Sequence, residues 1–343
     1  MKRIYALMII ALMLDSLHAV GQYASAVDYM SYLNNQETEL AKDYFDYVRA
    51  VAHSNSARKM ERRRKEVLAT VNQALNNAQG LKAYNGDTTL RGSYVTYYAI
   101  LRSVLNEDYG KIVDLEEIAE QSYDNMEAYL LAQEKAGEKL DEVSERREKA
   151  YENFAAQNKI RLVGTESKLS KKLAAGTRTS KYYHELFLIF FKANKQEYYL
   201  VNAFNEKNVN TIEQNRSTLA KYADEGVQKL DKVQPFDNDN TLIVACRKLM
   251  AFYKMEAVQK TPAIMQFLMK QKEFEKTKKA FEAKDDSDRT SEDVKAYNKM
   301  VDDLNKAATA SNQVNSELNA TRARLSDGWR DAVSRFLDVH TPR

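Results

Sequence analysis

The feature that most constrains this chain is the helical spacing of its apolar residues over long stretches without a helix breaker. Only 3 prolines and 10 glycines occur in 343 residues, so little interrupts a helix once it has begun. Between Leu90 and Val104, apolar and aromatic residues follow one another at steps of 4, 3, 4 and 3, which places them on one face of a helix. The pattern predicts an all-α protein of bundled helices.

The same spacing predicts helices along most of the chain. We expect them at about 25–52, 56–78, 90–104, 112–158, 181–205, 209–232, 240–258, 262–284 and 290–338. Between residues 161 and 180 the apolar periodicity gives way to GTESKLSKKLAAGTRTS, a stretch rich in Gly, Ser, Thr and Lys, which is typical of a linker. The sequence therefore predicts two tandem antiparallel helical bundles, at 22–160 and 181–343, joined by a linker at 161–180.

The two predicted bundles are related in sequence. A single offset of 152 residues aligns Tyr47 with Tyr199, Arg64 with Arg216, Tyr84 with Phe236, Asp87 with Asp239, Thr89 with Thr241 and Leu90 with Leu242. Self-similarity at a fixed offset is the mark of a repeated structural unit. We interpret the chain as an internal duplication of one helical bundle.

The stretch NGDTTLR, residues 85–91, resembles a turn that holds a ligand. The second predicted bundle has FDNDNTL at the matching place, and what persists between the copies is the aspartate, the threonine and the leucine. An aspartate before a helix accepts hydrogen bonds from the first free main-chain N–H groups, and Asn-Gly favours a tight turn. We therefore predict that Asp87 caps the next helix.

The first residues are typical of an export signal. Lys2-Arg3 precede an apolar run from Ile4 to Leu14, and the small-residue pattern Ala19-Val20-Gly21 follows. This order of charged, apolar and small residues is that of a secretory signal peptide, and the run is too short to span a membrane. We expect residues 1–21 to be removed and the mature chain, from Gln22, to be soluble in the periplasm or at the cell surface, with no transmembrane segment.

The overall charge argues against nucleic acid as a partner. Without Lys2, Arg3 and Asp15 the chain has 50 basic and 48 acidic side chains, a formal charge of +2. This balance is too even to steer the whole molecule onto nucleic acid or an anionic membrane. Any electrostatic recognition must be local.

Two local segments do concentrate charge. Residues 56–66 hold six bases and two acids, whereas residues 106–127 hold eight acids and one base. In an antiparallel bundle, Arg62, Arg63 or Arg64 would reach acids at helical spacing in the second segment; these acids are Asp114, Glu117, Glu120 and Asp124. We expect a solvated or interhelical ion-pair network there, and the alternative interpretation is a recognition surface.

No motif for catalysis, a metal or a cofactor is present. The histidines are isolated in sequence, there is no Gly-x-Ser-x-Gly or phosphate-cradling Gly-rich loop, and the single cysteine, Cys246, lies in an apolar stripe typical of a core thiol. We predict a protein without enzymatic activity. The alternative is a hydrolase or metal-dependent enzyme in which the acidic run converges with His53 or a second carboxylate.

One long segment carries a resemblance to a known family. Residues 86–142, GDTTLRGSYVTYYAILRSVLNEDYGKIVDLEEIAEQSYDNMEAYLLAQEKAGEKLDE, resemble an uncharacterised family of exported, all-helical bacterial surface proteins. The resemblance implies a location in the bacterial envelope or at the surface, and it supplies no catalytic residues.

These observations together favour a non-enzymatic, exported protein of two bundles that binds a partner, a protein or a glycan, at the cell envelope. The candidate binding residues are Arg62, Arg63, Glu117 and Glu120 on the two charged helices, with Asp87 and Arg91 beside them. A purely structural spacer is the remaining alternative.

Overall fold

The computed structural model describes residues 6–10, 23–53, 57–108, 119–165 and 168–342. The described chain is almost entirely helical, which confirms the all-α fold. It divides into two compact units, one of Met1–Lys181 with Leu337–Arg343 and one of Tyr182–Phe336. We call them unit 1 and unit 2 and describe each by itself.

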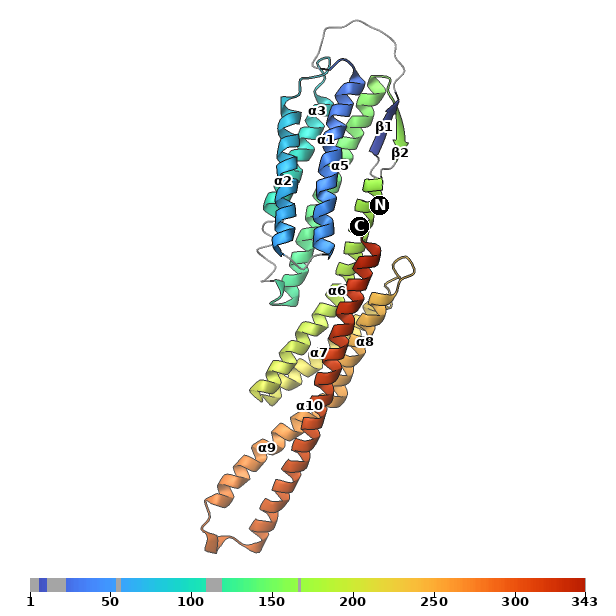
Figure 1. Ribbon diagram of the computed structural model, residues 1–343. Coiled ribbons are helices and arrows are strands. Elements are labelled where there is room, and N and C mark those ends of the chain that lie inside the picture. Colours follow the sequence, from blue (N-terminus) through green and yellow to red (C-terminus); the bar gives the residue numbers. More distant parts are fainter. Residues whose placement is uncertain (1–5, 11–22, 54–56, 109–118, 166–167, 343) are drawn as a thin grey trace. The chain divides into compact units, whose positions relative to one another are not determined.

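Unit 1 is built on four helices that lie side by side (Figure 1). They are α1 (Ala26–His53), α2 (Ala57–Gly80), α3 (Thr89–Ser103) and α5 (Tyr123–Gln157), and a π-helix, η1 (Val104–Asp108), extends α3. α1 packs on α2, α2 on α3, and α3 on α5. The core residues come from every helix: Tyr29, Met30, Leu33, Val67, Val71, Leu90, Tyr94, Tyr98, Tyr151 and Phe154.

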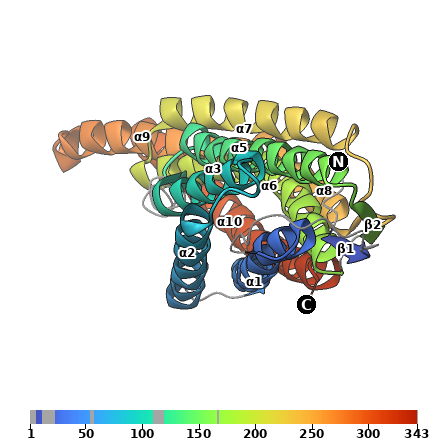
Figure 2. The same ribbon diagram turned by 90° about the horizontal axis from the view of Figure 1, so that it is seen from above.

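A short two-stranded sheet also belongs to unit 1. β1 (Ala6–Ile10) pairs antiparallel with β2 (Arg161–Thr165), and the two strands lie together in both views (Figures 1 and 2). β1 comprises the part of the predicted signal peptide that the structure describes, since residues 1–5 and 11–22 lie outside the described residues. Export therefore stays a prediction.

The predicted linker is corrected by the structure. Residues 161–165 form β2, and α6 (Lys168–Glu206) begins well before residue 181 and continues through the boundary between the units. The early part of α6 is helical because unit 1 supplies it with partners: Gly176 lies against Val48, and the Thr179 hydroxyl donates to the His340 carbonyl at 2.9 Å. Composition alone does not reveal such long-range contacts.

Unit 2 contains the rest of α6 with α7 (Val209–Leu230), α8 (Thr241–Met255), α9 (Thr261–Glu282) and α10 (Ser291–His340), which leaves the unit after Phe336. A π-helix, η2 (Glu256–Lys260), joins α8 directly to α9, so the predicted break before Pro262 is absent; the proline fits because it lies in the first turn of α9. The buried core includes Leu186, Leu200, Leu219, Leu242, Cys246, Leu249, Met250 and Phe336.

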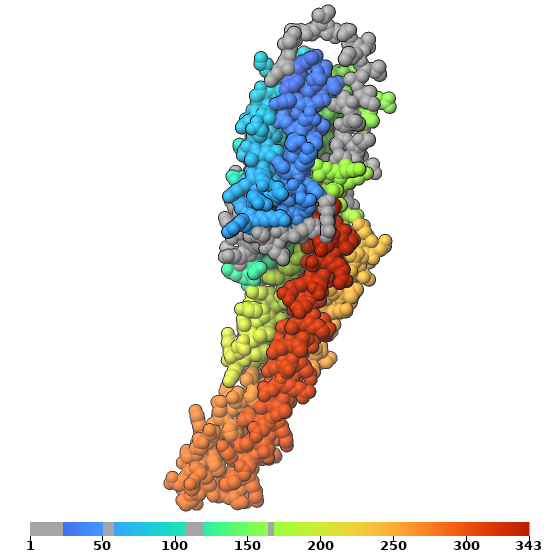
Figure 3. All heavy atoms as spheres, viewed as in Figure 1, coloured from blue at the N-terminus to red at the C-terminus, as the bar shows by residue number. Residues whose placement is uncertain are grey.

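The far part of α9 and α10 forms a hairpin of two helices, closed by the short 3-10 helix η3 (Asp286–Asp288) (Figures 1 and 3). The Phe281 and Tyr297 rings stack at 4.6 Å, and Lys284 Nζ lies 2.8 Å from the Asp293 carboxylate. Between Leu268 and Ser311, all of which is described, no side chain is fully buried. Two helices alone bury only one stripe of each other.

Several details recur in both units. α3 and α8 have the same length, their bounds differ by 152 residues, and each continues into a five-residue π-helix. Arg64 Nη1 donates to the Leu105 carbonyl in η1 at 2.7 Å, and Arg216 Nη1 donates to the Ala257 carbonyl in η2 at 3.3 Å. These matches fit the hypothesis of an internal duplication, which stays a hypothesis.

Within the described ranges, no helix combines the length and the apolar character that crossing a membrane would require.

Candidate functional site

The arginines of the predicted charged surface lie on the first half of α2 and pair mainly with that helix's own acids. Arg63 Nη1 lies 2.6 Å from Glu66 and 3.9 Å from Asp46 of α1, and Arg62 Nε lies 3.8 Å from Glu66. Arg64 binds Glu61 at 2.8 Å. Among the described residues these arginines pair with acids of α2 and α1, because acids one helical turn away are nearer. Pairing with Asp114 or Glu117 of the acidic run stays a prediction.

The acidic run is only partly described. Asp114 and Glu117 lie outside the described residues, and Glu120 is exposed in the turn before α5. α5 begins at Tyr123, where the Ser122 hydroxyl accepts a hydrogen bond from the Asn125 N–H at 3.1 Å, so the expected unbroken helix from 112 to 158 is interrupted at residues 120–122. Its expected start at 112 lies outside the described residues. The serine ends the turn because its hydroxyl caps a free N–H.

The residues that the enzyme alternative requires are only partly described. Asp124 is exposed in the first turn of α5, and the His53 side chain lies outside the described part. No group of three or more His, Cys, Asp or Glu residues within the described ranges could hold a metal ion. The convergence that this alternative requires stays a prediction.

Asp87 and Arg91 hold the turn between α2 and α3. Asp87 Oδ1 accepts a hydrogen bond from the Thr89 N–H, the first of α3, at 2.7 Å, which confirms that it caps this helix, although the N-cap position itself is Thr88. The Asn85-Gly86 pair has positive φ angles of 49° and 84°, as a tight turn requires. Arg91 Nη1 donates to the Leu81 carbonyl at 2.7 Å. Both side chains are thus used by the fold itself.

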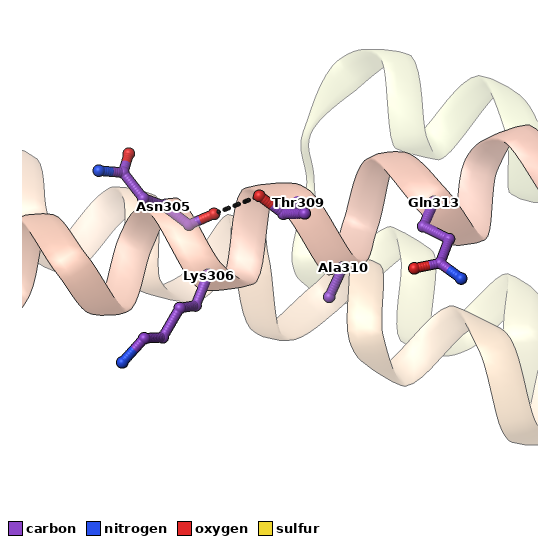
Figure 4. A pocket seen from close by; sticks show the side chains of 5 residues that line it. All are labelled: Asn305, Lys306, Thr309, Ala310 and Gln313. Atoms are coloured by element: carbon purple, nitrogen blue, oxygen red, sulfur yellow. Dashed lines mark hydrogen bonds between the residues drawn. The ribbon is translucent and has the colours of Figure 1, made fainter.

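A hollow of about 410 Å³ lies on α10, and Figure 4 shows its lining side chains along a single helix. The lining residues are Asn305, Lys306, Thr309, Ala310 and Gln313. The Thr309 hydroxyl donates to the Asn305 carbonyl at 3.0 Å, a bond internal to the helix. With one charged group and no paired acid and base, this lining offers no acid–base chemistry.

A buried ionic cluster in unit 2 was not foreseen from the sequence. Arg322 on α10 contacts both Glu197 on α6 and Glu256 on η2, and its Nη2 lies 2.6 Å from Glu256 Oε1. Glu197 is 4% exposed and Glu256 is 0% exposed. One indication was available: Glu256 follows Leu249 by seven residues and Tyr253 by three, which places it in the apolar stripe.

The environment of Glu256 opposes its negative charge. Burial, followed by the nearby Glu197, raises the pKa of its carboxyl to about 8, although Arg322 acts in the opposite direction. Glu256 Oε2 is buried and has no hydrogen-bond partner among the described residues. A carboxyl in these surroundings is protonated near neutral pH.

Unit 1 holds a different ion pair, in which the arginine is buried and the glutamate partly buried. Arg147 on α5 contacts Glu37 on α1, and its guanidinium lies over the rings of Tyr94 and Tyr97 at 5.5 and 5.1 Å. Burial lowers the pKa of Arg147 to about 10. The Glu37 side chain is 21% exposed, so the pair lies at the edge of the bundle core.

The first half of α2 exposes an excess of basic side chains. We define the α2 basic face as Arg58, Lys59, Arg62, Arg63 and Lys65. Of these side chains all but Arg63 are exposed, and no acid lies in the first turn of the helix. The basic face includes Arg62 and Arg63, the two basic candidates expected from the charged segment.

We compared the chain with models of known protein families, with curated proteins and with solved structures, and none of them matched.

Proposed function

We propose that this protein is an exported, non-enzymatic binding protein of the bacterial envelope, whose α2 basic face contacts an acidic surface of a partner protein. The observation that carries the proposal is a concentration of basic side chains at the N-terminal end of α2 with no acid in its first turn. Export is supported by the charged, apolar and small-residue order of residues 1–21 and by the family resemblance of residues 86–142.

The arrangement works against the stability of the helix. The N-terminal end of a helix carries a partial positive charge, so Arg58 and Lys59 in the first turn are unfavourable there. Arg58 and Arg62 are also spaced as i and i+4, as are Lys59 and Arg63, and like charges at that spacing repel. A surface that costs stability in the free protein is a candidate for binding.

The acids of α2 compensate only part of this charge. Glu66 contacts both Arg62 and Arg63, and Glu61 contacts Arg64 and Lys65. Arginine is enriched at protein interfaces, where its planar group pairs with carboxylates. The near-neutral whole chain and the local excess together favour one acidic protein patch over nucleic acid.

Site-directed photo-cross-linking tests the proposal. A photoreactive residue at Ala69, exposed on α2 beyond the basic face, would be compared with one at Ala296, exposed on α10. The tagged chain from Gln22 would be exposed to a native envelope fraction, and cross-linked products identified by mass spectrometry. We expect one acidic protein to cross-link from Ala69 and not from Ala296.

The affinity for the purified partner is then measured with a charge-reversal variant and with a matched control variant. Arg58→Glu, Arg62→Glu and Lys65→Glu together should weaken its affinity at least about tenfold, because complementary charges become like charges. Lys295→Glu, Lys299→Glu and Lys306→Glu on exposed α10 positions make the same change in net charge and should preserve binding. Equal affinities of the two variants, or retention by anionic lipid vesicles or glycans instead of a protein, would contradict the proposal.

A further inference from the structure

The buried cluster in unit 2 has an unusual charge count. Two carboxylates, Glu197 and Glu256, share a single guanidinium, that of Arg322. Glu256 Oε2 has no hydrogen-bond partner among the described residues, although the atom is buried. A second negative charge that is shielded from water is costly. A proton on one carboxylate removes this charge and provides an O–H group that can donate a hydrogen bond.

We propose that Glu197 and Glu256 share one proton in the folded protein, and that this proton locks the junction of α8 and α9 onto α10. The inference is independent of the proposed binding face on α2. It assigns a regulatory role to a cluster that lies inside unit 2 and is not part of any exposed surface.

The other charged groups around the two glutamates have partners of their own, so Arg322 balances the carboxylate charge. On α8, Tyr253 accepts a hydrogen bond from the Asn194 amide of α6 at 3.0 Å, and Cys246 is a buried thiol. On η2, Lys260 is paired with Glu317 of α10 at 2.7 Å. On α7, Arg216 is bound to Glu213 and to the Ala257 carbonyl. Among these groups, Arg322 is the cation that contacts the carboxylates.

The position of Glu256 in the chain links its charge to the stability of the junction between α8 and α9. It is the first residue of η2, the π-helix through which α8 passes into α9. The buried Thr261 hydroxyl, at the start of α9, donates to the Glu256 carbonyl at 2.9 Å. π-helical turns are rare and occur often at functional positions. Loss of the proton therefore places uncompensated charge at the junction that leads to the α9–α10 hairpin.

The direction of the pH effect follows from the raised pKa. The ordinary value for glutamate is 4.5, and in the fold the pKa of Glu256 is raised to about 8. Between these values the folded unit holds a proton that the unfolded chain has lost, so stability falls as pH rises. The contribution is fully present below about pH 4.5, and it is lost once pH passes about 8.

Trp329 provides a selective measurement, because it is the single tryptophan and lies buried in α10 within unit 2. Urea unfolding of the full chain from pH 5 to 8.5, followed by its fluorescence, would compare wild type with Glu256→Gln. Within the window the wild-type folded-to-unfolded ratio should fall, relative to that of the variant, by up to about tenfold per pH unit. Glu213→Gln, which alters an exposed carboxylate paired with Arg216, should keep the wild-type slope.

A direct titration keeps the test decisive if Glu256→Gln fails to fold. Carbon NMR of wild type labelled at its glutamate carboxyls should show one carboxyl that titrates near pH 8, and no such resonance should occur in a folded variant. Parallel stability curves for wild type and Glu256→Gln would overturn the proposal. So would a spectrum in which every glutamate titrates at or below its ordinary pH.

Discussion

Glu37 and Arg147 form an ion pair in unit 1 at the sequence positions that correspond, counted from a trio of contacting rings, to Phe190 and Trp329 in unit 2. A trio of contacting rings gives the reference: Tyr29, Tyr84 and Phe154 in one unit, and Tyr182, Phe236 and Phe336 in the other. Glu37 follows Tyr29 by eight residues, as Phe190 follows Tyr182, and Arg147 precedes Phe154 by seven, as Trp329 precedes Phe336. One unit has an ion pair where the other has rings stacked at 4.8 Å.

At three other positions, unit 2 has a charged residue where unit 1 has an apolar or aromatic one. Measured from the same rings, Glu197 corresponds to Tyr44 and Arg322 to Leu140, while the offset of 152 that relates α3 to α8 matches Glu256 to Val104. These three residues of unit 1 are apolar or aromatic and lie in its core or at its edge. The charged side chains that contact the core therefore lie at different positions along the helices of the two units. A helix of one unit that packed into the other unit would place a charge against apolar residues, which disfavours such an exchange.

The ion pair of unit 1 predicts a cost for losing one partner. Arg147→Met leaves the partly buried Glu37 carboxylate without its cation and should lower the free energy of unfolding by about 1–3 kcal/mol. Replacing both, with Glu37→Leu and Arg147→Met, should restore much of this loss, because the buried charge is gone. Far-UV circular dichroism during urea unfolding measures the change, and Trp329 fluorescence controls for unit 2. Equal losses in the single and double variants would show that the pair is not the cause.

The two capping aspartates predict equal and modest effects. Asp87 and Asp239 each accept a hydrogen bond from the N–H two residues ahead, at 2.7 and 2.8 Å. Changing either one to alanine leaves that N–H without its partner and should cost about 1 kcal/mol. Thermal unfolding would compare these variants with Asp302→Ala, an exposed position inside α10. The interpretation of Asp87 as a cap fails if its replacement is no more harmful than that of Asp302.

Two glycines predict changes of opposite sign. A Cβ at Gly226 in α7 would lie 2.5 Å from Met250 Sδ and 3.4 Å from Ile189 Cγ2, so Gly226→Ala should destabilise unit 2 by about 1–3 kcal/mol. A Cβ at Gly137 in α5 meets nothing within 4 Å, so Gly137→Ala should stabilise its helix by up to about 1 kcal/mol. Urea midpoints of the two variants test this, and a destabilised Gly137→Ala would be the contrary result.

The single cysteine predicts a protected thiol. Cys246 is fully buried, and burial raises the pKa of its thiol to about 12. The thiolate is the reactive form, so alkylation at pH 8 should be negligible in the native protein and complete after unfolding in guanidinium. Mass spectrometry of the intact chain counts the label. Rapid labelling of native protein would mean that α8 opens without global unfolding.

Features that depend on neighbours in the chain were predictable. The period of the apolar residues placed α1, α2, α3 and α7 within a few residues of their observed bounds, because one exposed face and one buried face suffice to define a bundle helix. The cap at Asp87 was predictable because its partner is two residues away. The arginines of α2 show the limit: their charge pattern was visible, but the choice of partner was not.

The sequence by itself determined that this chain is all-α, where most of its helices lie, and how its turns are capped, since these follow from periodicity and local hydrogen bonds. Only the tertiary structure decided that residues 168–180 are helical, that α8 continues into α9, and that Glu256 and Arg147 are buried. The reason is distance along the chain. Glu256 meets Arg322 across 66 residues and Arg147 meets Glu37 across 110, and whether a charge in an apolar stripe is tolerated depends on the helix that packs against it.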